Sequence, residues 1–140
     1  MRHEGLLSAA HQLGRISMLF DNLSSSLALI KAGEVQALGV TTLKRSHAAP
    51  EIPTLAEQGL TSFEAVSWFS LMAPANLPPD IQKRLNQMVL QTLSNPGVKS
   101  KLLAGGLDPA PGSPKDLSKL IASEASKWGK VVQQSGAKLE

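Results

Sequence analysis

Apolar residues in the second half of the chain recur every three or four positions, the spacing that places them on one face of an α-helix. The pattern covers residues 80–93 and, over a longer stretch, residues 114–135. Polar and charged residues fill most positions between them, so each stretch has an apolar and a polar face. We therefore predict two amphipathic helices here, separated by a short helix that begins at Pro96.

Capping residues mark the ends of these predicted helices. Asn95 stands directly before the short helix, where its side chain can accept hydrogen bonds from the first turn. Ser113 and Asp116 have the spacing of a capping box, in which each side chain bonds to the backbone of the other residue. Gly136 and the pair Gly105-Gly106 follow helix ends, which is typical of left-handed C-terminal caps.

The first half shows a different pattern. Two short apolar runs, Ile16–Phe20 and Val35–Val40, have the length and composition of buried strands. Between them, residues 23–32 place apolar side chains on one helical face, and Gly33 follows as a cap. A further helix is expected over His3–Leu13. Because strand, helix and strand in this order form a βαβ unit, we predict an α/β fold with parallel sheet elements flanked by helices.

A polar, proline-punctuated surface connection follows, over residues 41–54. Thr54 and Glu57 have capping-box spacing and predict a short helix over Leu55–Gln58. Beyond it, Glu64–Met72 has the sequence EAVSWFSLM, which is rich in residues that favour strands. We predict an extended, β-like segment there.

The amino-acid composition excludes several classes of protein and of site. A chain of 140 residues with 42% hydrophobic and 18% charged residues suits one globular core. The absence of cysteine excludes disulfides, thiolate metal sites and a cysteine nucleophile. No apolar run approaches the roughly 20 residues of a membrane-spanning helix. Near the start, Glu4 and His11 interrupt any apolar leader, so no secretion signal is predicted in this sequence.

The net charge of +3 does not indicate a nucleic-acid site, because the basic residues are scattered along the chain. Few side chains are available to stack on bases, since the aromatic residues are only Phe20, Phe63, Trp68, Phe69 and Trp128. We predict that Trp68 and Phe69 pack either in the core or between two lobes of the fold. Trp128 belongs to the apolar stripe of a predicted helix and is expected in the core. Nucleic acid is therefore not an expected partner.

No constellation of catalytic residues appears. The sequence has no nucleophile-elbow motif, and the three histidines, His3, His11 and His47, have no acidic or metal-ligating partners at suitable spacing. Gly105-Gly106 is better explained as a helix cap than as a phosphate-binding loop. We predict no enzyme activity, no metal site and no cofactor.

The turn at Asp21-Asn22 is the best candidate site. It stands at the carboxyl end of a predicted strand and opens a helix, and both places favour ligands in parallel α/β folds. The N–H groups of a helix start favour anions, so a carboxylate could bind there. Alternatively, Asp21 or Asn22 simply caps the helix. Spacing alone leaves both interpretations open.

Several motifs occur in an order that resembles one family. They are GRISMLFDNLSSSLALIKAGEVQALGVT (14–41), KRS with EIPTLAEQG (44–59), SWFSLMAPANLPPDIQKRLN (67–86), and LLAGGLDP with SPKDL and EASKWGKVVQQSG (102–136). Together they resemble the extracytoplasmic solute receptors of tripartite tricarboxylate transporters, the TctC or Bug family. The resemblance runs from about Gly5 onward, and the PTLAEQG and SWF…AP…P motifs are its most specific parts.

The resemblance implies a partial periplasmic-binding-protein type II-like fold, the Venus flytrap of two α/β lobes. It covers the C-terminal half of such a receptor only. Residues 1–66 would then be a remnant of the second lobe, with a helix, the βαβ unit and the Pro-rich loop. Residues 67–140 would form a crossing strand and the helices that return to the first lobe. Ser70 stands where the family commonly has Gly, and Ser17 where it usually has Asp.

The resemblance also implies ligand-binding residues. By the family's pattern, Phe20, Asp21 and Asn22 lie on a loop that lines the interlobe cleft, and Ser24 lies at the helix start just beyond. The implied ligand is a small carboxylated solute.

Two functional hypotheses follow. The first is a truncated solute-binding protein without catalysis, whose partners in the full-length family are membrane transporter subunits, and whose solute binding is weak or lost. The second is an oligomeric interaction or structural module that no longer binds solute. Unpaired strand edges and apolar helix faces predict a homodimer, with a domain swap across Ser67–Pro74. The family is periplasmic; without a signal peptide in this chain, a cytoplasmic location stays open.

Overall fold

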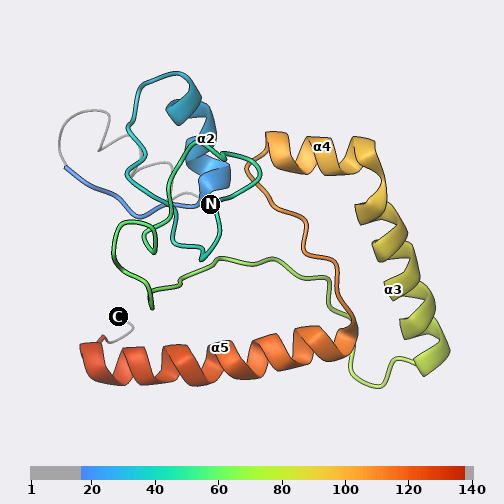
Figure 1. The fold of residues 1–140 in the computed structure, drawn as a ribbon. Coiled ribbons are helices and arrows are strands. Elements are labelled where there is room, and N and C mark those ends of the chain that lie inside the picture. The colour runs from blue at the N-terminus through green and yellow to red at the C-terminus, as the bar shows by residue number, and fades with distance from the viewer. Residues whose placement is uncertain (1–16, 138–140) are drawn as a thin grey trace. The chain divides into compact units, whose positions relative to one another are not determined.

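A computed structural model describes residues 17–137 of the chain. Within that range the helices are α2 (Leu23–Lys31), α3 (Pro79–Ser94), α4 (Pro96–Ala104) and α5 (Pro114–Ser135). They appear as coiled ribbons in Figure 1, from α2 in blue to α5 in red. The sequence pattern predicted each of these helices to within a residue or two at both ends. The helix predicted over His3–Leu13 lies outside the described residues.

The predicted caps of the later helices are confirmed. The Asn95 side-chain oxygen accepts from the N–H groups of Gly97 at 2.9 Å and Val98 at 3.3 Å. The Ser113 hydroxyl accepts from the Asp116 N–H at 3.2 Å, and the Asp116 carboxylate accepts from the Ser113 N–H at 3.0 Å. These bonds satisfy N–H groups that have no partner inside the helix. They explain why α4 and α5 begin where they do.

The predicted helix over Leu55–Gln58 is only partly confirmed. Its capping-box bonds are present: Thr54 N–H donates to the Glu57 carboxylate at 2.7 Å, and Glu57 N–H donates to the Thr54 hydroxyl at 3.0 Å. The backbone beyond them forms a series of turns instead of a helix. The N–H groups of Gln58 and Gly59 bond three residues back and the N–H of Leu60 bonds five residues back, so the i→i−4 bonds of an α-helix do not form.

The predicted parallel sheet is not confirmed. In the described part of the chain the only β-pairing is an isolated parallel bridge between Val40 and Thr54. Val40 N–H donates to the Pro53 carbonyl and Val40 carbonyl accepts from Leu55 N–H, each at 2.9 Å. Val40 therefore pairs with the proline-rich connection and not with residues 17–20. Apolar composition shows that a segment suits a sheet, but it does not identify a neighbouring strand.

The described core is small and lies around α2. Leu27, Ala49 and Ile52 are buried and form one hydrophobic cluster, with four partly buried residues packed against it: Leu23, Ile30, Ala37 and Val40. The Thr54 side chain is buried beside the bridge to Val40. The apolar face of α2 thus packs on the connection that follows it. The core positions α2, and with it the turn at its N-terminus.

The chain divides into two compact units. The first holds residues up to Phe69 together with Asn95–Pro109, and the second holds Ser70–Ser94 and Ala110–Glu140. The first unit thus contains α2 and α4, and the second contains α3 and α5. The division of residues 1–66 and 67–140 between receptor lobes stays a prediction.

The helices of the second unit bury no residue. Trp128, predicted to be a core residue, is 39% exposed, and its indole N–H donates to the Glu124 carboxylate at 2.7 Å. Phe69, also predicted to be packed, is 77% exposed. As core residues both were predicted wrongly, because an apolar stripe is buried only when another layer covers it. The alternative for Phe69, packing between lobes, stays a prediction.

Candidate functional site

The candidate site is the turn that leads into α2. The Asp21 carboxylate accepts from the Asn22 N–H at 2.9 Å, the Ser25 hydroxyl at 3.2 Å and the Ser26 hydroxyl at 2.5 Å. Asn22 is the N-cap residue, but its side chain makes no capping hydrogen bond. Asp21 therefore holds the first turn together, the role that the sequence allowed to either residue.

The three consecutive serines of α2 differ in what their hydroxyls do. Those of Ser25 and Ser26 bond to Asp21, whereas the exposed Ser24 hydroxyl has no hydrogen-bond partner in the structure. The backbone N–H groups of Leu23 and Ser24 also make no hydrogen bond, as expected for the first two residues of a helix. The turn thus offers three donors close together, at the positive end of the α2 dipole.

Phe20 precedes this turn and is 71% exposed. Its ring is therefore accessible apolar surface on the segment that leads into α2. All the predicted site residues lie on this one short segment: Phe20, Asp21, Asn22 and Ser24. Direct hydrogen bonds connect Asp21 with Asn22 but not with Phe20 or Ser24.

A residue that sequence reasoning did not place at this turn is Gly106. It follows α4, has φ of 74°, and lies against α2: a Cβ built on it would meet the Leu23 carbonyl group and the Ser24 Cα at 2.9 Å. The prediction of a left-handed cap after α4 is confirmed. The close approach to α2 had no sequence signal, because it joins segments about 80 residues apart.

A second polar cluster connects the same part of the chain to the loop at residues 46–47. The Asp108 carboxylate accepts from the Ser46 hydroxyl at 2.5 Å and from the His47 N–H at 3.1 Å. It also lies 2.9 Å from His47 Nδ1. Burial raises the pKa of Asp108, but the hydrogen bonds from Ser46 and His47 outweigh it, so the pKa lies below the ordinary value. His47 is exposed, and Asp108 is an acidic partner for it that spacing in the sequence did not indicate.

Residues 17–137 contain neither a candidate metal site nor a candidate membrane-spanning helix. No group of three or more His, Cys, Asp or Glu side chains in residues 17–137 is placed to hold a metal ion. Over the same residues, no helix is both long and apolar enough to cross a membrane.

Relatives with known sequences match most of this chain. A UPF0065 protein from the tcbD-tcbE intergenic region of Pseudomonas sp. (strain P51) is 38% identical over 120 residues, 85% of this chain and 36% of that protein. Protein BugT of Bordetella pertussis is 33% identical and covers 91% of this chain and 39% of its own length. A UPF0065 protein from the clcB-clcD intergenic region of Pseudomonas knackmussii is 35% identical over 93% of this chain and 79% of the relative.

Solved structures also match most of this chain. The structure described as R. palustris Rpa4515 with adipate has a TM-score of 0.82 and 34% identity, over 95% of this chain and 44% of that protein. The periplasmic binding protein BugD, at 24% identity and a TM-score of 0.69, shows the shared fold only. The neighbours support a partial periplasmic-binding-protein fold, and the chain spans less than half of each of these two structures.

The family model that matches covers residues 6–137, nearly the whole sequence, and describes the tripartite tricarboxylate transporter family receptor, TctC. The motifs noted between residues 14 and 136 fall inside this match. This family consists of solute receptors and not of enzymes. The chain belongs to the TctC family of tripartite tricarboxylate transporter receptors.

Proposed function

We propose that this chain is a part of a TctC-type receptor that binds a small carboxylated solute at the N-terminus of α2, without catalysis. The contact residues would be Phe20, Asp21, Asn22 and Ser24. Like its family, the receptor would work in the periplasm and deliver solute to membrane transporter subunits. The observation that carries the proposal is the set of unpaired donors at the α2 start, in a chain of this family.

The chemistry of the turn suits one carboxylate of the solute. Two backbone N–H groups and the Ser24 hydroxyl can donate to the two oxygens, and the α2 dipole favours the negative charge. The Asp21 carboxylate is also negative, but three donors already surround it, which reduces its repulsion of an anion. Exposed Phe20 offers apolar surface to a carbon chain. The adipate in a structural neighbour is an example of such a solute bound by a relative.

Affinity is expected to be weak. Ligand sites bury most of a small molecule's surface between opposing walls, and this chain matches only 44% of the adipate-bound protein. The turn of α2 would then supply one wall of the site. The solute stays partly hydrated, so each hydrogen bond contributes less than in a closed cleft.

The test is calorimetric titration with adipate, compared between the natural chain and two serine variants. Ser24→Ala removes the unpaired hydroxyl and is expected to weaken binding about five- to tenfold, which corresponds to roughly 1 kcal/mol for one hydrogen bond. Ser123→Ala in α5 is the matched control, since the Ser123 hydroxyl bonds to the Leu120 carbonyl within that helix and is not part of the turn. Equal affinity of all three proteins for adipate would remove this turn from the binding site.

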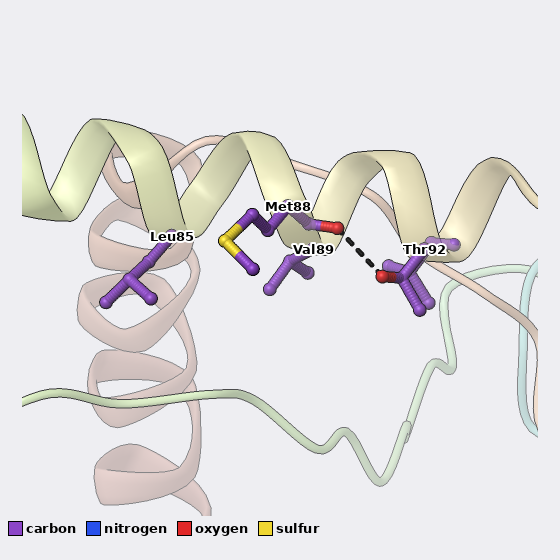
Figure 2. A pocket seen from close by; sticks show the side chains of 5 residues that line it. Leu85, Met88, Val89 and Thr92 are labelled. Carbon is purple, nitrogen blue, oxygen red and sulfur yellow. Dashed lines mark hydrogen bonds between the residues drawn. The ribbon is translucent and has the colours of Figure 1, made fainter.

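A second candidate is an oligomeric module that has lost solute binding. It is favoured by the apolar stripes of α3 and α5, whose large side chains are exposed in this structure. Figure 2 shows Leu85, Met88 and Val89 projecting from one side of α3, where they line an apolar hollow with Thr92 and Leu93. A homodimer, with or without exchange of segments, would cover such surfaces. Light scattering that reports only monomer at micromolar concentration, together with measurable adipate binding, would reject this candidate.

A further inference from the structure

The three residues 106–108 that follow α4 are bonded at both ends of the segment. At its start, the N–H groups of Gly106 and Leu107 donate to carbonyl groups of α4, at 3.0 and 2.9 Å, and close the C-terminus of that helix. At its end, the Asp108 carboxylate accepts hydrogen bonds from the loop at residues 46–47. The segment is thus attached to α4 on one side and to this loop on the other.

The loop at residues 46–47 is itself attached to the core around α2. Ser46 is buried, its hydroxyl accepts from the Ala48 N–H at 3.1 Å, and its carbonyl accepts from the Ala49 N–H at 3.3 Å. Ala49 is fully buried and belongs to the same hydrophobic cluster as Leu27 of α2. Because this packing joins the loop to α2, a group bonded to the loop has a fixed position relative to that helix.

Asp108 makes that bond with a charged group. One carboxylate oxygen accepts from the Ser46 hydroxyl, and the other accepts from the His47 N–H and lies 2.9 Å from His47 Nδ1. Burial raises the pKa of Asp108 and these hydrogen bonds lower it by more, so the carboxylate is charged at neutral pH. Hydrogen bonds to an ionised acceptor are roughly twice as strong as those between neutral groups.

Two residues before Asp108, the backbone of Gly106 lies against the start of α2. A Cβ built on Gly106 would meet the Leu23 carbonyl group and the Ser24 Cα at 2.9 Å. Leu23 and Ser24 are the residues whose N–H groups make no hydrogen bond in the structure. A continuous series of contacts therefore leads from the core, through the loop and Asp108, to the donors of the candidate site.

We propose that Asp108 is a positioning residue for the candidate binding turn. Through the loop at residues 46–47 it holds the Gly106 backbone against the first two residues of α2, and so sets where their donors lie. Its effect on solute affinity rests on the proposed function. Its effect on the α2 start does not, and the two can be measured separately.

In the alternative, the bonds to α4 are sufficient to place Gly106, and Asp108 contributes only to stability. The two cases differ in the response to Gly106→Ala. If Asp108 holds the segment, removing its carboxylate lets the segment move away from the added methyl group, so the substitution becomes less harmful. If the bonds to α4 are sufficient, the effects of the two substitutions add.

The first test is a double-mutant cycle of Gly106→Ala and Asp108→Ala, followed by urea unfolding at pH 7. We expect Gly106→Ala to reduce the free energy of unfolding by about half as much in the Asp108→Ala background as in the natural chain. Gly33→Ala is the control, since Gly33 has a similar φ but no atom within 4 Å of an added Cβ. It should cost the same in both backgrounds. Ser46→Ala replaces Asp108→Ala in the cycle if the latter does not fold.

The second test observes the α2 start directly. Asp108→Ala should shift the amide resonances of Leu23 and Ser24 in the ligand-free chain, and should weaken adipate binding roughly three- to tenfold by calorimetry. Arg45→Met is the matched control from the same loop. Arg45 bonds to Glu57 and to the Pro50 carbonyl, so its loss should leave both the resonances and the affinity unchanged.

The possible results separate this proposal from the proposed function. Additive losses in the cycle, with unchanged resonances of Leu23 and Ser24, would overturn the positioning role. Coupled losses and shifted resonances in a chain that does not bind adipate would support that role and reject the proposed function. Equal adipate affinity of the natural chain and Asp108→Ala would overturn the effect of Asp108 on solute binding.

Discussion

Gly106, which has no side chain, lies directly against the start of α2 at the candidate site. Its backbone lies so close to α2 that any Cβ would contact the carbonyl group of Leu23 and the Ser24 Cα at 2.9 Å. Its φ of 74° is also a conformation that other residues adopt only at a cost. The glycine thus permits the chain after α4 to pass beside the donors at the α2 start.

Gly106→Ala is therefore expected to destabilise the first unit by about 2 kcal/mol, from strain and displaced backbone together. Adipate binding should weaken with it, because α2 must shift. Urea unfolding and calorimetry measure the two effects. Gly33→Ala is a suitable control: Gly33 has a similar φ of 73° but no atom within 4 Å of an added Cβ, so only the conformational part should appear. Equal effects of both substitutions would contradict a role for the close approach.

Asp108 links pH to the stability of the first unit. Burial raises the pKa of Asp108, and hydrogen bonds from Ser46 and His47 lower it by more, so the folded pKa lies below the ordinary value. A depressed folded pKa stabilises the protein above the unfolded pKa, and this stability is lost as pH falls through the folded value. The contribution is complete above roughly pH 5 and decreases below roughly pH 4.

Asp108→Asn should cost about 1 kcal/mol at pH 7, since the partly exposed site screens the interaction. The variant and the natural chain should converge in stability as pH falls through the depressed folded pKa of Asp108, because the carboxyl is then protonated in both states. Urea unfolding at a series of pH values checks this. A stability difference that is constant from pH 7 to the acid limit would show that the carboxylate's charge is unimportant.

At the scale of elements, helix α5 offers the clearest stability prediction. Gly129 lies inside this 22-residue helix, and an added Cβ would meet no atom within 4 Å. Gly is less favourable than Ala in a helix interior by roughly 0.5–1 kcal/mol. Gly129→Ala should therefore stabilise α5 by about that amount, measured by thermal unfolding followed by helical circular dichroism. Destabilisation would indicate that another surface packs closely on α5 at this position.

Local sequence was sufficient to predict the helix caps but not the pairing of a strand. Asn95 and Ser113 are bonded to the first turns of α4 and α5 as their spacing predicted. Such caps depend on residues two or three positions apart, so no distant part of the chain can change them. The predicted strand at residues 35–40 depends on a neighbour instead. Its last residue, Val40, pairs with Thr54, a partner that its own sequence does not specify.

At the scale of the whole molecule, the two units differ in burial. The first contains the cluster of Leu27, Ala49 and Ile52, while α3 and α5 of the second bury no residue. Because burial of apolar surface provides most of the free energy of folding, the second unit should be the less stable. Trp68 belongs to the first unit and Trp128 to the second, so each has one fluorescent reporter.

Urea unfolding of the variants Trp68→Phe and Trp128→Phe should give two different midpoints. The protein that retains Trp128 is expected to unfold at lower urea than the one that retains Trp68. Both substitutions are at partly exposed positions, with 37% and 39% of the residue accessible, so their own effect on stability should be small. A single midpoint, reported by both proteins and by circular dichroism, would show that the chain unfolds as one cooperative structure.

The sequence by itself determined the helices, their caps and the family, since these depend on spacing within a few residues or on ordered motifs such as PTLAEQG. It also located the turn at Phe20, Asp21, Asn22 and Ser24 as the candidate site. Only the tertiary structure decided which serine hydroxyl stays unpaired, that Gly106 lies against α2, and that Asp108 bonds to Ser46 and His47. Those contacts join residues distant in sequence, and the packing of the folded chain, not local pattern, brings them together.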